Sequence, residues 1–515
     1  MSFLSAGTAR CAGLALVLAI TVAACVGDGQ GGDGEGGAAE SQLTLAVGAH
    51  PSTADSFFDN SLIARAVYVP IYDSLFRPIE GEMVPRLAEE WTWLNDTTLE
   101  IQLREGVTFH DGEEFDAEAL KWNIDTLIEL GAEAVNADAV ATIDRVEVVD
   151  SHTVNLHLST PDGGLIGLLS AVFIQSPSAY ESDPQEYARA PVGTGPFRVV
   201  EWRQDETITM EAFEDHWEGV PQVDRLVIRS ITEPGSRVAA IQAGEVDISY
   251  DIQAEQAERL QDEAGIEIVN AGLGQVLVLY LRNNQGDPVE DPRVRRAIAH
   301  ALDVEALGNG LLGDYAQPAS GALNTSDVLG HVADLEPYPY DPDQAKQLLT
   351  EAGYADGLEV EFATTSGRYA KDREAAEAVA AQLEQVGISV DLRVMESGAW
   401  LEDLFASKMP SLYTMGLTSA PRYDAASNYD VICGQIRAAD DDQLCDLDDR
   451  QRATSDQDER RRILQKMARR VYDRTYAINL YQLPGIYAVS SAVEGLKILT
   501  DQSFLDYLNL RVGAE

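Results

Sequence analysis

Two short motifs contain the residue types of a catalytic or cofactor site. Residues 109–112, Phe-His-Asp-Gly, place a histidine beside a carboxylate, a pairing used in general base catalysis. However, Asp-Gly is a common turn dipeptide, and Asp116 is placed to cap a following helix. Residues 193–195, Gly-Thr-Gly, lack the third glycine and the following helix of a dinucleotide-binding loop. We therefore interpret both motifs as turns.

Residues 440–442, Asp-Asp-Asp, superficially resemble a calcium-binding loop. They lack the alternating ligands and the central glycine of an EF-hand, which favours a solvated acidic loop. The motifs of zinc proteases and serine hydrolases do not occur in a supporting context, and the seven histidines are scattered. Trp91, Trp93 and Trp217 are interpreted as packing residues. The sequence therefore predicts no enzyme, no metal site and no cofactor, with a secreted hydrolase as the alternative of a different class.

The four cysteines predict one disulfide bond. Cys11 and Cys25 lie in the N-terminal segment, which leaves Cys433 and Cys445 in the body of the chain. A single pair in an oxidising compartment is typical of a disulfide, and closing so short a loop contributes on the order of 3 kcal/mol. The alternative, a zinc site, lacks nearby histidine ligands.

The first 41 residues predict an export signal and a tether. Residues 1–25 carry one charge, Arg10, before an apolar run that is too short to span a bilayer. The run ends in Val-Ala-Ala-Cys25, which resembles the lipobox of bacterial lipoproteins, in which the cysteine is lipidated; an ordinary signal peptide is the alternative. Residues 26–41 are Gly-rich and acidic, as in a flexible tether. We expect a protein that is lipid-anchored to the outer face of the cell membrane.

The charge of the chain excludes nucleic acid as a partner. The 515 residues include 37 Lys and Arg against 86 Asp and Glu, a formal net charge of −49. A surface this negative repels phosphate backbones. The length suggests two to four domains, and the hydrophobic content of 45% is that of a folded globular protein.

Strands and helices alternate from residue 42 onward. Residues 42–47 and 225–231 read as strands, and residues 358–362, 372–386 and 388–394 read as a strand, a helix and a strand. The last three form a βαβ unit, which requires parallel strands. Ligands bind beyond the carboxyl ends of such strands. The loops in that position are expected at residues 48–58, 363–371 and 418–429.

Several segments, in this order, resemble the extracellular solute-binding proteins of ABC importers, the peptide- and nickel-type family called family 5. The segments are residues 84–91 (VPRLAEEW), 99–120, 191–197 (PVGTGPF), 213–231, 237–248, 291–303 and 340–354. The resemblance implies an α/β fold of the two-lobed periplasmic-binding-protein type (type II, cluster C-like) with an additional inserted subdomain. We expect lobe I at 42–80, 192–272 and 489–515, the inserted subdomain at 81–191, and lobe II at 273–488. The resemblance also implies that the two lobes close over a ligand and do not catalyse a reaction.

The resemblance supplies two main site residues. In dipeptide-type members an arginine before the helix corresponding to 372–386 binds the ligand carboxylate, and Arg368 falls on that position. An aspartate after the strand corresponding to 411–417 binds the ligand amine, but Leu417 and Ala420 replace the aromatic residue and the aspartate of that motif. Asp424 is either the substitute or a structural residue. The remaining candidate ligand contacts are Tyr423, His50, Phe57, Phe173 and Tyr280.

Together these observations predict a monomeric receptor that delivers a small solute to the transmembrane subunits of an ABC permease. A short peptide is the favoured solute, because a closed cleft with an acidic and a basic side chain matches its two charged ends. An opine, a sugar and a metal chelate remain alternatives within the same fold.

Overall fold

The structure is a computed structural model of the whole chain. It describes residues 41–59, 61–79, 82–272, 274–283, 286–317, 319–326, 328–419, 423–434, 439–498 and 505–513. The expected signal peptide with Cys25, all but the last residue of the expected tether, and Ala420 lie outside these residues. The chain divides into the units Met1–Ala39 and Glu40–Glu515, and the second is described below.

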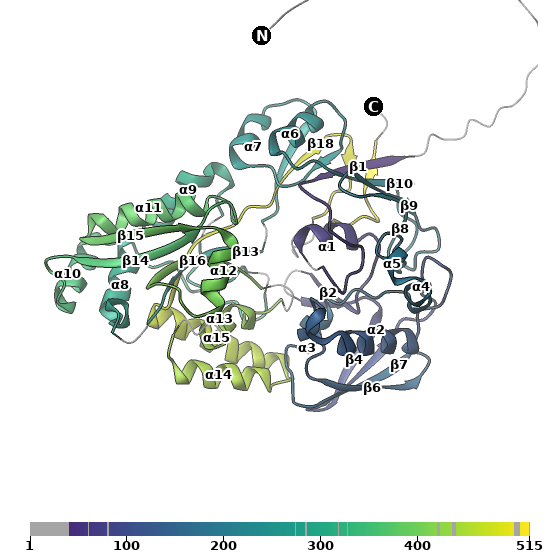
Figure 1. Cartoon of the computed structure of the whole chain (residues 1–515), viewed down its shortest axis with the longest axis horizontal. Coiled ribbons are helices and arrows are strands. Elements are labelled where there is room, and N and C mark those ends of the chain that lie inside the picture. Colours follow the sequence, from purple (N-terminus) through teal and green to yellow (C-terminus); the bar gives the residue numbers. More distant parts are fainter. Residues whose placement is uncertain are drawn as a thin grey trace, which may run out of the picture. The chain divides into compact units, whose positions relative to one another are not determined.

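Lobe I is built on a seven-stranded mixed sheet (Figure 1). Its strands, in spatial order, are β12 (Ile266–Asn270), β18 (Ile486–Ser490), β11 (Ile248–Ser249), β1 (Gln42–Val47), β10 (Arg225–Ser230), β9 (Thr207–Ala212) and β8 (Phe197–Arg203). Its helices are α1 (Leu62–Tyr68), α6 (Pro234–Gln242) and α7 (Ala254–Leu260), and β19 (Val493–Glu494) pairs with β20 (Arg511–Val512). Alternation along β1 places Leu43, Leu45 and Val47 in one core and Ala46 in another, so the sheet is buried on both faces.

The inserted subdomain carries a four-stranded antiparallel sheet of order β4-β5-β7-β6. Its strands are β3 (Glu82–Pro85), β4 (Ala88–Asn95), β5 (Thr98–Leu103), β6 (Ile143–Asp150) and β7 (Thr153–Leu158). β3 pairs separately with β2 (Phe76–Ile79), which lies before the expected boundary at residue 81. Its helices are α2 (Ala117–Leu130), α3 (Leu165–Leu169), α4 (Pro177–Ser182) and α5 (Pro184–Tyr187). As expected, Asp116 caps α2, accepting a hydrogen bond from the backbone N–H of Ala119 at 2.9 Å.

Lobe II contains a five-stranded sheet of order β15-β14-β16-β13-β17. The strands are β13 (Gln275–Leu281), β14 (Leu358–Thr365), β15 (Ile388–Met395), β16 (Leu412–Thr418) and β17 (Ala477–Gln482). The helices are α8 (Pro292–Ala301), α9 (Val304–Leu312), α10 (Pro342–Ala352), α11 (Asp372–Gln385), α12 (Ser397–Phe405), α13 (Ala426–Cys433), α14 (Asp442–Arg452) and α15 (Gln457–Arg474). The β14-α11-β15 unit has parallel strands, which confirms the predicted crossover.

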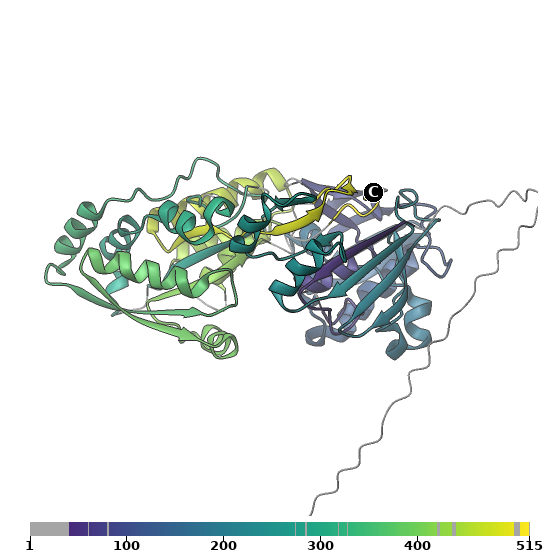
Figure 2. The same cartoon turned by 90° about the horizontal axis from the view of Figure 1, so that it is seen from above.

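Two segments connect the lobes. Ala271 and Gly272 follow β12 on the way to β13, and residues 483–485 join β17 to β18 within the yellow C-terminal part of the chain in Figure 2. They lie side by side, since the backbone N–H of Leu483 bonds to the carbonyl of Gln275 at 2.9 Å and that of Ala271 to Gly485 at 3.0 Å. β18 begins at Ile486, three residues before the expected boundary at 489, and it pairs with β12 of lobe I from that residue onward.

The glycines of residues 193–195 permit a close approach between two backbones. A Cβ atom on Gly193 would lie 2.2 Å from the carbonyl oxygen of Ile71, and one on Gly195 would lie 2.6 Å from its carbonyl carbon. Side chains cannot be accommodated at such distances. The motif is therefore a packing device where the inserted subdomain meets lobe I, in agreement with its interpretation as a turn.

His110 holds this glycine segment in place. Its Nε2 lies 2.9 Å from the carbonyl oxygen of Gly195, and its Nδ1 accepts a hydrogen bond from the backbone N–H of Gly193 at 3.3 Å. The neutral ring with hydrogen on Nε2 satisfies both contacts. Burial lowers the pKa of His110 to about 4.

Acid is therefore expected to weaken the fold through His110. Between pH 6.5 and about 4 the unfolded chain binds a proton at this residue and the folded chain does not. The free energy of unfolding should fall across this window by up to about 3 kcal/mol as the pH decreases. Urea unfolding from pH 7.5 to pH 4 measures this, with His110→Gln, which lacks the titrating ring, as the comparison. Equal pH slopes in the two proteins would contradict the assignment.

A buried carboxylate anchors the same junction. Asp73, with 1% of its surface exposed, accepts hydrogen bonds from Arg86 at 2.8 Å, Trp217 Nε1 at 3.0 Å and the Thr194 hydroxyl at 3.1 Å. Burial opposes ionisation, but the neighbouring Arg86 and His216 outweigh it and hold the pKa of Asp73 well below its usual range. Trp217 is thus a packing residue, as predicted.

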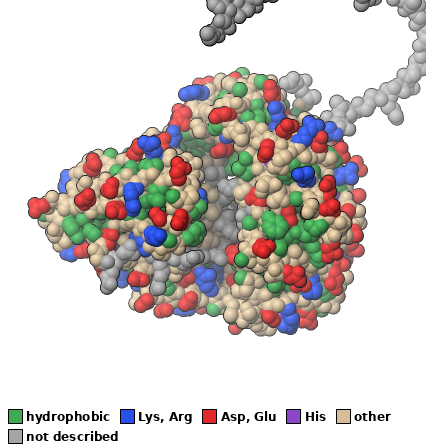
Figure 3. Space-filling model, viewed as in Figure 1, with side chains coloured by type: hydrophobic (Ala, Val, Ile, Leu, Met, Phe, Trp, Pro, Cys, Tyr) green, Lys and Arg blue, Asp and Glu red, His purple; other side chains and the backbone are tan. Residues whose placement is uncertain are grey.

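Asp and Glu side chains are spread over the face shown in Figure 3. Among the described residues, no helix has the length and apolar character needed to cross a membrane.

Candidate functional site

The loop after β14 is held by a buried carboxylate. Asp372, 1% exposed, begins α11 and accepts backbone N–H groups from Gly367 at 2.9 Å, Arg368 at 3.0 Å and Tyr369 at 3.2 Å. It also accepts the hydroxyl of Thr365 at 2.7 Å. The backbone of the loop is therefore fixed at the carboxyl end of the parallel strand, where ligands of such sheets bind.

The side chain of Arg368 is exposed and lies against aromatic rings. Its Cζ is 5.5 Å from the ring centre of Tyr369 and 5.9 Å from that of Trp400, and its Nε donates to the Tyr369 hydroxyl at 3.1 Å. Within the described part of the chain, no carboxylate pairs with Arg368. A guanidinium placed this way can receive a ligand carboxylate through two parallel hydrogen bonds.

Gly416 sets the position of Tyr369. A Cβ atom at residue 416, on β16, would lie 2.3 Å from the Tyr369 ring, so any larger residue would displace it. Trp400, on α12, is 1% exposed, and its Nε1 has no hydrogen-bond partner among the described residues. Sequence reasoning did not identify Tyr369, Trp400 or Asp372. Only the adjacency of Tyr369 to Arg368 was available as a signal.

Asp424 is buried and paired. Its Oδ2 lies 2.6 Å from Arg460 Nη2, and both side chains are at most 3% exposed. Its Oδ1 accepts the backbone N–H of Ala426 at 2.9 Å. Of the two roles that the sequence left open, the geometry matches that of a structural residue. Tyr423, just before it, has a left-handed backbone (φ 52°), and its N–H bonds to the carbonyl of Ser419 at 2.7 Å.

Five other candidate contacts have little exposed surface. They are His50 (8%), Phe57 (1%), Phe173 (7%), Tyr280 (0%) and Leu417 (4%). Phe57 and Phe173 lie in cores of the inserted subdomain and lobe I, and Tyr280 stacks on Tyr413 at 5.1 Å in the lobe II core that also holds Leu417. His50 Nε2 lies 3.2 Å from the carbonyl of Ile228, and burial lowers its pKa. In this structure these side chains are packed in the protein interior.

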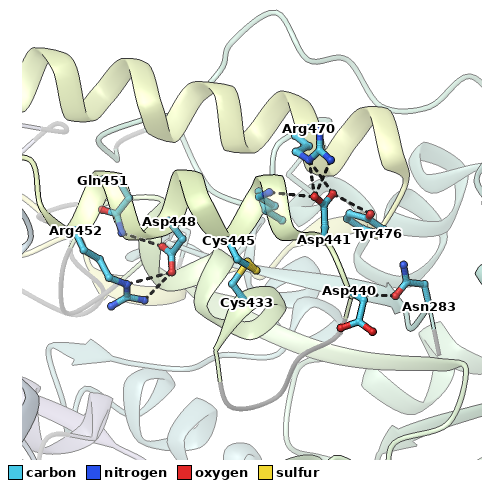
Figure 4. Close-up of a disulfide and its surroundings, with 11 residues drawn as sticks. Asn283, Cys433, Asp440, Asp441, Cys445, Asp448, Gln451, Arg452, Arg470 and Tyr476 are labelled. Atoms are coloured by element: carbon cyan, nitrogen blue, oxygen red, sulfur yellow. Dashed lines mark hydrogen bonds and ion pairs between the residues drawn. A yellow bond between two sulfur atoms is a disulfide. The ribbon is translucent and has the colours of Figure 1, made fainter. Parts of the chain in front are cut away.

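The two body cysteines form a disulfide (Figure 4). Cys433 ends α13 and Cys445 lies in α14, with their Cα atoms 5.3 Å apart. Beside it, Asp441 caps α14 and bonds to Arg470 Nε at 2.8 Å and the Tyr476 hydroxyl at 3.0 Å. Burial opposes ionisation of Asp441, but these partners outweigh it and lower its pKa. Asp441 is thus buried and paired, unlike the solvated residue that we expected, because α14 and α15 enclose it.

No group of three or more His, Cys, Asp and Glu side chains in the described ranges could hold a metal ion. Two α/β lobes joined by paired connections define the architecture of a two-lobed binding protein.

Comparison with known proteins places the chain in one family. The model for bacterial extracellular solute-binding proteins, family 5, matches residues 82–435, and the chain belongs to this family. It is 32% identical over 369 residues to the glutathione-binding protein GsiB of Salmonella paratyphi A, covering 70% of each chain. The chain is a solute receptor of an ABC importer.

Two solved structures share the fold. The ABC transporter substrate-binding protein CtaP of Listeria monocytogenes matches with a TM-score of 0.83 at 21% identity, over 92% of this chain and 100% of that one. DppA of Helicobacter pylori, solved with the peptide STSA, matches with a TM-score of 0.72 at 23% identity, over 92% and 99%. These matches confirm the predicted two-lobed fold.

Proposed function

We propose that this receptor captures short peptides and binds their carboxylate through Arg368. The observation that carries the proposal is the environment of Arg368. In a chain with 86 acidic residues, this arginine has no carboxylate partner in the described ranges and rests on Tyr369 and Trp400. A cation left unpaired against so large an excess of acid is available for an anionic ligand.

The relatives support a peptide as the ligand. GsiB binds glutathione, a modified tripeptide, and the DppA structure holds a tetrapeptide. Both ligands carry a free carboxylate. The pairing of Asp424 with Arg460 leaves the amine end of the ligand without an assigned partner. We therefore assign the carboxylate end alone.

Native mass spectrometry of the purified mature protein tests the proposal. We expect a co-purified peptide mixture, or binding of added glutathione or of the tetrapeptide Ser-Thr-Ser-Ala at a ratio of one per chain. Capture of one defined sugar or opine, with neither probe bound, would replace the peptide proposal. Binding that requires added nickel would point to a metal chelate.

We further propose that the receptor is a non-enzymatic, monomeric lipoprotein anchored through Cys25. The small residues before Cys25 and the Gly-rich tether after it support the anchor. Lipid labelling should depend on Cys25, and Cys25→Ser should move the protein out of the membrane fraction. A variant that remains fully in the membrane fraction contradicts the anchor.

A further inference from the structure

A tight turn of the inserted subdomain lies against lobe II. The backbone N–H of Gly163 bonds to the carbonyl of Arg452 at 2.7 Å, and its carbonyl accepts Gln457 Nε2 at 3.2 Å. A Cβ atom on Gly163 would lie 2.0 Å from the carbonyl oxygen of Thr454 and 2.8 Å from Arg460 Cδ. Only glycine can be accommodated at position 163. Asp162 fixes the turn by accepting the Gly164 N–H at 2.9 Å and the Thr142 hydroxyl at 3.0 Å.

Arg460 lies beside Gly163, and its side chain extends to the loop before α13. Its guanidinium is 3% exposed and bonds to Asp424 at 2.6 Å and to Gln451 Oε1 at 2.9 Å and 3.0 Å. Asp424 in turn holds the Ala426 N–H, and Leu329 pairs with the same segment through the Tyr423 and Ala425 backbones. The aliphatic part of the Arg460 side chain therefore lies beside the Gly163 turn, while its guanidinium bonds to Asp424 in the segment at 423–426.

A cavity of about 160 Å³ adjoins this contact. Trp91 and Ile166 line it from the inserted subdomain, and Leu329, Tyr423 and Arg460 line it from lobe II. Gln457 and Arg461 also line it, but the side chains of Arg460 and Asp424 are at most 3% exposed, and such a pair is strongest when water is excluded. Moving the Gly163 turn away would open this side of the pair to solvent.

We propose that Arg460 is a positioning residue. It couples the packing of the Gly163 turn against lobe II to the conformational order of the segment at 423–426. The segment follows the carboxyl end of β16, on the side of the sheet where the ligand is expected to bind. Packing of the Gly163 turn against lobe II therefore favours the conformation of lobe II that binds the ligand. Release of the turn hydrates Arg460, weakens its hold on Asp424 and loosens the segment. The consequence for ligand affinity rests on the proposed function, whereas the coupling itself does not.

Gly163→Ala tests the coupling, because it adds one methyl group at position 163 and changes no charge. Hydrogen exchange of the mature protein without ligand should be at least about tenfold faster at residues 423–426, although these lie in the other lobe. Dissociation constants for glutathione and for Ser-Thr-Ser-Ala should rise by about tenfold. Gly310→Ala is the matched control, since no heavy atom lies within 4 Å of the added methyl group and exchange should stay within twofold.

A milder variant covers the case in which Gly163→Ala does not fold. Gln457→Ala removes only the exposed side chain that bonds to the Gly163 carbonyl, and exchange at 423–426 should rise by a smaller factor. Arg460→Lys keeps the charge but loses the fork to Asp424 and Gln451, so the exchange should rise even with an intact Gly163. Wild-type exchange in the folded Gly163 or Gln457 variant would overturn the coupling. If wild-type protein binds neither probe, the peptide proposal fails while the exchange result still decides the coupling.

Discussion

Replacing Asp424 with alanine is expected to destabilise the protein by about 3–5 kcal/mol. The substitution leaves the Arg460 guanidinium, 3% exposed, without its carboxylate, and the Ala426 N–H without its acceptor. An uncompensated buried charge is among the most costly single changes in a protein interior. Chemical denaturation of the ligand-free protein measures the effect.

Two further variants separate the buried pair from a surface effect. Asp424→Ala combined with Arg460→Met removes both charges and should recover part of the lost stability. Asp458→Ala removes an exposed partner of Arg461 and should cost less than about 1 kcal/mol. If Asp424→Ala unfolds like the parent but loses ligand affinity, Asp424 is a ligand residue and its structural role is refuted.

Replacing Arg368 with alanine is expected to weaken binding of glutathione or Ser-Thr-Ser-Ala by roughly 10- to 1,000-fold. Closure over the ligand strips water from the guanidinium and the carboxylate, so losing one partner leaves the other unpaired. Arg368→Lys should recover only part of the affinity, because an ammonium cannot form two parallel hydrogen bonds to one carboxylate. Isothermal titration measures both changes.

Thermal stability should hardly change in Arg368→Ala, since the side chain is exposed. Arg373→Ala is the matched control, because Arg373 lies five residues later in an exposed pair with Glu377. Its removal should leave affinity within about twofold. Parental affinity in a folded Arg368→Ala protein would refute the assignment and favour an uncharged ligand bound by aromatic and backbone contacts.

The elements that position the site could be predicted because their side-chain periodicity is regular. The strand at residues 42–47 and the helix beginning at 372 occur as predicted, and the strands at 358 and 388 run parallel. Each depends on alternation or on helical spacing within one segment. The exposed position of Arg368, on a loop after such a strand, follows from the same local pattern.

The contacts of the site depend on pairs that are distant in the sequence. Asp424 and Arg460 are 36 residues apart in the sequence. Tyr369, in the loop after β14, lies against Gly416 on the neighbouring strand β16. No local pattern reports whether a carboxylate turns inward to an arginine or outward to a ligand. Phe57, Phe173 and Tyr280 are buried in this structure, and an aromatic residue in a core has the same local sequence signature as one in a cleft.

The position of β18 has a consequence for how the chain acquires its structure. β18 lies between β12 and β11 in the seven-stranded sheet of lobe I, which also contains β1, the first strand of the chain. Lobe I therefore cannot complete its hydrogen bonding until residues 486–490 are available, after all of lobe II has been synthesised. Such non-local closure delays folding relative to synthesis. The complete hydrogen bonding of lobe I is therefore a late event, which depends on the last 30 residues of the chain rather than on its first strand.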